Sequence, residues 1–439
     1  MATGGTWTTQ NKVRPGTYIN FVSEAKPIGA IGERGIVTIP LVLSWGEPKK
    51  VIAIEAGEDT FGSLGYSITD PKMLLVRETL KRAKTLLAYR VNVGTKATAT
   101  AGNLTVTARW GGVRGNDITI VIQTNIDDNA KFDVKTLISG TVYDTQTVAN
   151  IAGLVANDWV VWSGTGALAT NAGVPLTSGA DGTVTNQDYT DFLAAVEIFD
   201  FNTMALPVTD NTLKSAYVSF AKRLRDDEGK KIQVVVENYP AADYEGVISV
   251  KNGVILSDGT TLTAAQATAW TAGATAGAQM NQSLTFTAYD DAVDVGTRYT
   301  NSQIEAALQA GEFLFTANAG RALVETDINS FTGFVPAKNK TFSKNRVLRV
   351  LDGINNDFVR IFADFYIGKV DNNADGRNLL KNECVRYLET LQNINAIQNF
   401  DSETDITVVQ GNETDSVYIE LYIQPVDAIE KIYMKVVVR

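Results

Sequence analysis

Apolar and polar side chains alternate along the last residues of the chain. The apolar positions are every second one: Ile432, Met434, Val436 and Val438. This period of two predicts a half-buried β-strand that continues to the final residue. Because an unpaired apolar strand edge tends to pair with another chain, this strand either closes a sheet inside its own molecule or pairs with a neighbour.

A shorter strand pattern lies near the start of the chain. It follows a break at Pro15-Gly16 and includes Thr17, Tyr18, Ile19 and Phe21. The residues before it are polar and rich in Gly and Thr. We therefore expect residues 1–24 to form an N-terminal arm.

The first two segments after this arm differ in their periodicity. Residues 25–95 contain a strand pattern at 35–44 and then a helical pattern, which begins at Asp70-Pro71 and extends to Leu87. This combination predicts the first part of an α/β layer. Residues 96–186 show short strand patterns broken by Gly and Asp turns, which predict an inserted all-β sandwich domain.

Helical and strand patterns alternate again over residues 187–336. This alternation predicts an α/β domain with a largely parallel sheet. Residues 337–439 contain two helical patterns followed by two closing strands. The expected fold class is therefore α/β, with an inserted all-β sandwich and an α+β C-terminal domain.

The composition excludes several classes of function. The 439 residues carry a formal charge of −10, which argues against a general nucleic-acid binder. The chain contains no histidine, so Ser-His-Asp and Cys-His catalysis and most zinc sites are excluded. No motif requires a nucleotide, and we expect no cofactor and no metal.

Targeting signals and disulfides are not expected either. The first residues lack the basic and apolar regions of a signal peptide, and no run of about 18 apolar residues is present, so we expect neither secretion nor membrane insertion. A single cysteine, Cys384, fits folding in a reducing cytoplasm. It lies among apolar residues of a predicted helix, which favours a buried thiol.

Positive charge is concentrated between Lys338 and Arg386. This window holds ten basic and six acidic residues, so its net charge is +4 and the rest of the chain carries −14. Two interpretations remain open for it: an ordinary solvated face or a docking surface for an acidic partner.

Two short motifs resemble functional sites and depart from them. A possible calcium loop carries oxygen ligands at positions one, three and five: Asp371, Asn373 and Asp375. Its twelfth position is Asn382 where an acidic residue is needed, so a turn at the start of a helix is favoured. Ser219 and Lys222 have the S-x-x-K spacing of Ser/Lys hydrolases, but the partner motifs S-D-N and K-T-G are missing.

Several longer stretches resemble the contractile tail sheath family of bacteriophages and phage-tail-like particles, the PBSX-type phage-like element sheath in particular. They follow the family order over nearly the whole chain: RPGTYINF, GIVTIPLVLSWGEP, GNDITIVI, WTAGATAGAQMNQSLT, NRVLRVLDGINND, YIGKVDNNADGRNLLKNE and QPVDAIEKIYMKV. Each stretch is weak alone, and together they are specific. The resemblance implies that the α/β layer is subtilisin-like in topology, without a catalytic triad.

The resemblance also implies a structural subunit and not an enzyme. Copies would polymerise as stacked hexameric rings around a tail tube and contract to drive the tube through a target cell envelope. The partners would be other copies, the tail tube protein, and baseplate and tail-terminator proteins, without nucleic acid or membrane insertion. The subunit would be assembled in the cytoplasm of a bacterial host and function in a virion tail or phage-tail-like particle.

The resemblance further implies roles for particular residues. Both terminal arms would pair across neighbouring subunits into shared sheets. The C-terminal domain would face the tube, so we expect three basic residues of its second helix to meet acidic side chains of the tube: Arg377, Lys381 and Arg386. Two alternatives stay open, a hydrolase on a subtilisin-like scaffold that uses Ser219 and Lys222, and a tail tube or capsid protein.

Overall fold

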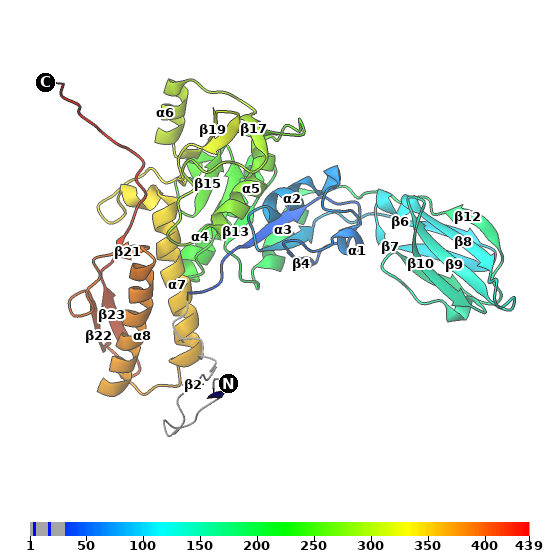
Figure 1. Ribbon diagram of the computed structural model, residues 1–439, viewed down its shortest axis with the longest axis horizontal. Helices are drawn as coiled ribbons and strands as arrows, with labels where there is room; N and C mark the ends of the chain where they lie inside the picture. Colours follow the sequence, from blue (N-terminus) through cyan, green and yellow to red (C-terminus); the bar gives the residue numbers. More distant parts are fainter. Residues whose placement is uncertain (1–2, 6–15, 19–30, 439) are drawn as a thin grey trace. The chain divides into compact units, whose positions relative to one another are not determined.

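The computed structural model describes residues 3–5, 16–18 and 31–438. The described chain forms two compact units, and Figure 1 labels many of their elements. The large unit consists of residues 33–356, 394–398 and 424–438. The small unit consists of the described residues up to Gly32, 357–393 and 399–423.

A seven-stranded sheet forms the centre of the large unit. Its order is β18-β15-β14-β13-β3-β5-β4, and all neighbouring strands are parallel except β5 and β4. Strands from before and after the inserted β segment therefore share one sheet. The bounds are β3 (Ile36–Leu41), β4 (Val51–Glu55), β5 (Thr85–Arg90), β13 (Thr203–Ala205), β14 (Gln233–Glu237), β15 (Val247–Val250) and β18 (Glu312–Phe313).

Helices cover both faces of this sheet. On one face α2 packs against α5, and Ile39 and Trp270 belong to the same apolar core. On the other face α3 packs against α4, and Tyr89 and Tyr217 belong to a second core. The helices are α2 (Leu74–Leu80), α3 (Asn186–Val196), α4 (Asn211–Lys222) and α5 (Ala264–Gly277).

The helix expected to extend to Leu87 is shorter than predicted. Asp70 accepts a hydrogen bond from the backbone N–H of Lys72 and starts a single 3-10 turn, and the helix that follows ends at Leu80. Leu87 lies in β5, where residues 86–90 are all buried. A strand buried on both faces has a continuous apolar sequence, so periodicity does not distinguish it from a helix.

The inserted segment is a β-sandwich of two antiparallel sheets. Its core includes Val106, Ile120 and Trp159, and Trp159 stacks on Trp45 with ring centroids 4.5 Å apart. Because Trp45 follows β3, this pair joins the sandwich to the α/β layer. One sheet holds β6 (Lys96–Ala101), β7 (Leu104–Gly111) and β11 (Val160–Gly164), and the other β8 (Ile118–Thr124), β9 (Phe132–Ile138), β10 (Thr141–Val148) and β12 (Asn171–Pro175).

Shorter elements complete the large unit. Two antiparallel pairs lie beside the sheet, and α6 precedes β18. The C-terminal segment contributes β24, which pairs with β21. The bounds are α1 (Phe61–Leu64), β16 (Val254–Leu256), β17 (Ala292–Val295), α6 (Asn301–Gln309), β19 (Phe315–Asn318), β20 (Arg321–Val324), β21 (Ile397–Gln398) and β24 (Gln424–Pro425).

The small unit is built on the end of α7, which begins in the large unit, and on α8. Asp357 of α7 accepts a hydrogen bond of 2.7 Å from the hydroxyl of Tyr387 in α8. The apolar stripe that the helical period of α8 predicts is buried: Leu380, Cys384, Leu388 and Leu391. The hairpin β22–β23 packs on α8. The bounds are β1 (Thr3–Gly5), β2 (Gly16–Tyr18), α7 (Asn345–Phe365), α8 (Ala374–Asn393), β22 (Ile406–Gln410) and β23 (Val417–Leu421).

We expect Gly273→Ala to destabilise the large unit. A Cβ atom at this position in α5 would lie 2.3 Å from the backbone carbonyl oxygen of Thr79 in α2, so the two helices would have to move apart. Overpacking of this kind costs about 1–3 kcal/mol of unfolding free energy, measurable by urea unfolding. The control is Gly296→Ala, whose nearest neighbour is 3.5 Å away. Equal stability of the two variants would contradict this packing.

Candidate assembly surfaces

The C-terminal segment after β24 is the largest exposed apolar feature that the sequence predicted. Residues 426–438 form neither helix nor strand, and the exposed fractions of the four alternating side chains range from 74% to 91%: Ile432, Met434, Val436 and Val438. The half-buried strand expected here is thus absent from the single chain. The physical reason is that no strand of the described chain pairs with it, so its backbone groups form no ladder of hydrogen bonds.

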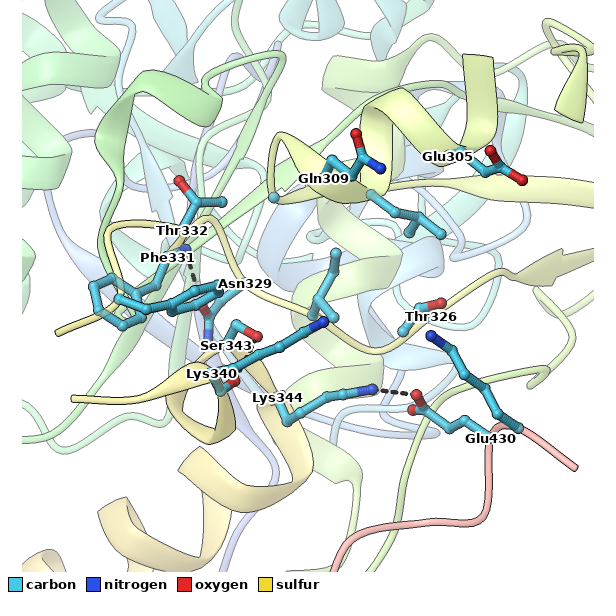
Figure 2. Close-up of a pocket in the computed structure, with 15 residues that line it drawn as sticks. Glu305, Gln309, Thr326, Asn329, Phe331, Thr332, Lys340, Ser343, Lys344 and Glu430 are labelled. Carbon is cyan, nitrogen blue, oxygen red and sulfur yellow. Dashed lines mark hydrogen bonds and ion pairs between the residues drawn. The ribbon is translucent and has the colours of Figure 1, made fainter. Parts of the chain in front are cut away.

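The root of this segment is fixed to the large unit. The backbone N–H of Val426 donates to the carbonyl of Ala396 at 3.0 Å. The carboxylate of Glu430 pairs with Lys344 and accepts a hydrogen bond of 2.9 Å from the hydroxyl of Thr285. Figure 2 shows the pair of Lys344 and Glu430 at one end of a cleft. The sequence analysis missed this anchor, because two residues 86 positions apart leave no local pattern.

The N-terminal arm is only partly described. Thr17 and Tyr18 lie in β2, which pairs in parallel with β1 of the same chain. Ile19 and Phe21 lie outside the described residues. Pairing of this arm with another copy remains a prediction.

The three basic residues proposed for α8 differ in their surroundings. Arg386 is exposed and forms an ion pair with the buried Glu383 one turn earlier. Arg377 donates to the side-chain oxygen of Asn372 at 2.9 Å, so it is tied to the preceding loop. Lys381 is half-buried and makes no ion pair with any residue of the described chain. The three side chains do not form one cluster of free charge.

The basic window is less available for a partner than its net charge suggests. At least half of its ten basic residues form ion pairs within this chain: Lys338, Lys344, Arg349, Arg360 and Arg386. An acidic partner therefore has at most five basic residues of this window without such an ion pair to recognise.

The two short motifs take ordinary structural roles. Asn373 accepts a hydrogen bond of 2.9 Å from the backbone N–H of Gly376 and caps the start of α8. Ser219 and Lys222 are both exposed on α4, and the Lys222 ammonium lies over the ring of Tyr244, 5.1 Å from its centroid. Within the described ranges, no cluster of three acidic or cysteine side chains could hold a metal, and no helix could cross a membrane.

The single thiol is inert by its surroundings. Cys384 is fully buried in α8. Burial in this apolar site raises the pKa of the thiol to about 12. The reactive thiolate is therefore scarce at neutral pH.

Four models of phage tail sheath domains match the chain in succession. They are the domain III N-terminal region of tail sheath protein Gp18 at residues 34–91, the tail sheath β-sandwich domain at 92–181, the tail sheath central domain at 182–330 and the tail sheath C-terminal domain at 337–439. The phage-like element PBSX protein XkdK of Bacillus subtilis is 43% identical, over 99% of each chain. This chain belongs to the phage tail sheath family.

Solved structures of sheath proteins share the whole fold of this sheath subunit. The sheath tail protein of Desulfitobacterium hafniense is 68% identical, with a TM-score of 0.87 over 96% of this chain and 99% of its own. The sheath tail protein Lin1278 of Listeria innocua is 44% identical, with a TM-score of 0.82 over 92% of this chain and 94% of its own. The protein is thus a tail sheath subunit with a mixed α/β fold and a β-sandwich domain.

Proposed function

We propose that copies of this sheath subunit polymerise as stacked hexameric rings around a tail tube and contract to drive the tube through a target cell envelope. The observation that carries this proposal is the exposed C-terminal segment, which is anchored at Glu430 and has no partner strand in the described chain. The extended lattice is metastable, and it persists because the activation barrier to contraction is high. Contraction is a rotation and sliding of subunits into larger interfaces.

The lattice is held together by strands shared between copies. The C-terminal segment and the N-terminal arm each pair with a sheet of a neighbouring subunit. The hairpin β22–β23 supports this proposal, because each of its strands has a single partner among the described residues and keeps one open edge. Paired arms let the lattice deform without dissolving.

The α/β layer is a structural scaffold and not a catalytic domain. The parallel sheet with helices on both faces supports a subtilisin-like topology for the α/β layer. The chain has no histidine for a catalytic triad, and Ser219 is exposed beside a lysine held over Tyr244, which supports a non-enzymatic role.

Baseplate and tail-terminator proteins cap the two ends of the sheath. Assembly takes place in the cytoplasm of a bacterial host.

Electron microscopy tests the proposed function directly. Purified particles are imaged before and after exposure to acid or denaturant. We expect an extended striated sheath that becomes shorter and wider. A narrow smooth tube in both conditions would instead favour a tail tube protein.

We expect the small unit to hold the tube through Lys381 and Arg386, and less strongly through Arg377. Each exposed charge pair contributes about 0.2–1 kcal/mol, and helical repetition multiplies it along the tail. A variant with Lys381→Glu and Arg386→Gln should fold and fail to assemble with the tube at physiological salt. Glutamine is preferred at position 386, because a glutamate there would face the buried carboxylate of Glu383.

Co-sedimentation with purified tube protein measures this contact. The control is Lys222→Glu, which reverses an exposed charge on α4 in the large unit. We expect the control to assemble as the parent does. Extended tails of normal length from the double variant would assign the tube contact to other residues.

A further inference from the structure

A cleft of about 420 Å³ lies in the large unit beside the root of the C-terminal segment. Figure 2 shows Glu305 and Gln309 of α6 along one side, and Lys340 and Lys344 across from them. The apolar surface of the cleft comes from four side chains: Leu308, Ile328, Phe331 and Phe334. Phe334 is 44% exposed, so part of this surface is open to a partner.

The rim of the cleft carries a small net positive charge, because three lysines outnumber the carboxylates of Glu305 and Glu430. Lys344 is paired with Glu430, and Glu305 accepts a hydrogen bond of 2.8 Å from the side chain of Asn301. Lys340 and Lys431 also line the cleft, and no carboxylate of the described chain lies within 4 Å of their ammonium groups. The cleft therefore fits an apolar side chain that has a carboxylate next to it.

The loop after α3 presents this combination on another part of the same unit. Ile198 is 85% exposed and is followed by the exposed Phe199 and by Asp200. The side chain of Asp200 is fully exposed, and one of its oxygens lies 3.6 Å from the ammonium group of Lys230 in a long, solvated ion pair. Lys230 donates hydrogen bonds to the carbonyls of Glu197 and Phe199, which fixes the backbone of the loop. Large apolar side chains that are exposed on a loop with a fixed backbone are typical of residues that bind a partner protein.

We propose that this loop of one subunit docks into the cleft of a second copy. Ile198 and Phe199 cover the apolar surface, and Asp200 faces Lys340 and Lys431. The two complementary surfaces lie on different parts of the chain, so the contact is heterologous and its repetition produces a ring or a helical filament. The proposal rests on the proposed self-assembly and adds a specific contact to it.

Cross-linking between two variants tests the contact. Asp200→Cys and Lys340→Cys are made separately, and the two proteins are mixed before assembly and oxidised afterwards. The native thiol does not compete, because Cys384 is buried and its pKa is raised to about 12. We expect a disulfide-linked dimer from the mixture and none from either variant alone. A chain that carries both substitutions should give a ladder of larger oligomers, because each copy then supplies both sides of the contact and can be linked to two others.

A second experiment measures how much the loop contributes to assembly. Ile198→Ser should raise the protein concentration needed for sheath formation by roughly tenfold or more, as expected for the loss of one buried isoleucine. The matched control is Ile126→Ser, which removes an isoleucine that is 94% exposed on a different loop and also precedes an aspartate. We expect the control to assemble at the concentration of the parent protein.

The outcomes separate this docking from the proposed function. Sheaths that form from the cysteine mixture without a cross-linked dimer overturn the docking and leave the function intact. Assembly of Ile198→Ser and Ile126→Ser at the same concentration does the same. Failure of the parent protein to form sheaths overturns the proposed function and the docking with it.

Discussion

A chain that ends at Lys431 is expected to fold as a monomer and to form no sheath. The deletion removes the exposed apolar residues 432–438, which bury nothing within their own chain, so the interior of the large unit is untouched. It also removes the backbone groups with which this segment would extend the sheet of a neighbour, whereas single substitutions would leave those groups in place. Cutting after Val426 would have the same aim but would also remove Glu430, which pairs with Lys344.

Analytical ultracentrifugation measures whether the shortened chain is a monomer, and electron microscopy shows whether it forms sheaths. The deletion variant should sediment as a monomer, with the thermal unfolding midpoint of the parent. Glu430→Ala is a second variant for comparison. It removes the contacts of Glu430 with Lys344 and Thr285 and keeps residues 432–438. Tubes of normal length from the chain that ends at Lys431 would show that the shared strand is dispensable.

Asp352→Ala is expected to cost about 3–5 kcal/mol of unfolding free energy, because it leaves a buried guanidinium without its partner. Arg225 is only 3% exposed and donates two hydrogen bonds to the carboxylate of Asp352, at 2.7 and 2.8 Å. Burial disfavours the charged form of Arg225, but the attraction of Asp352 outweighs it and the net effect raises the pKa of the guanidinium. This pair fastens α7 to the segment that follows α4.

Urea unfolding of matched variants isolates the effect of burial. The comparison is Arg298→Ala, which removes an exposed ion pair with Asp294 and should cost far less than Asp352→Ala. The double variant Arg225→Met with Asp352→Leu should recover most of the loss, since no charge then remains buried. Similar losses for Asp352→Ala and Arg298→Ala would mean that Arg225 finds another partner or water.

Features with a local period could be predicted from the sequence. The period of two over residues 432–438 predicted a strand that the single chain does not form, and its pairing with another copy stays a prediction. The period of 3.6 in α8 identified its buried stripe, from Leu380 to Leu391. The change to short strand patterns after residue 96 identified the β-sandwich, and the absence of histidine excluded whole classes of catalysis.

Pairings between distant residues were decided only by the tertiary structure. The strand that contains Leu87 is surrounded by β3 and β4, and its continuous apolar sequence could equally have continued a helix. The anchor of Glu430 on Lys344 joins residues that no short pattern relates. Net charge predicted a basic surface, but several of its charges are paired with residues outside the window, for example Lys338 with Glu245 and Arg349 with Asp327. A local pattern records which face of an element is apolar, whereas the partner of each face or charge depends on how the whole chain is folded.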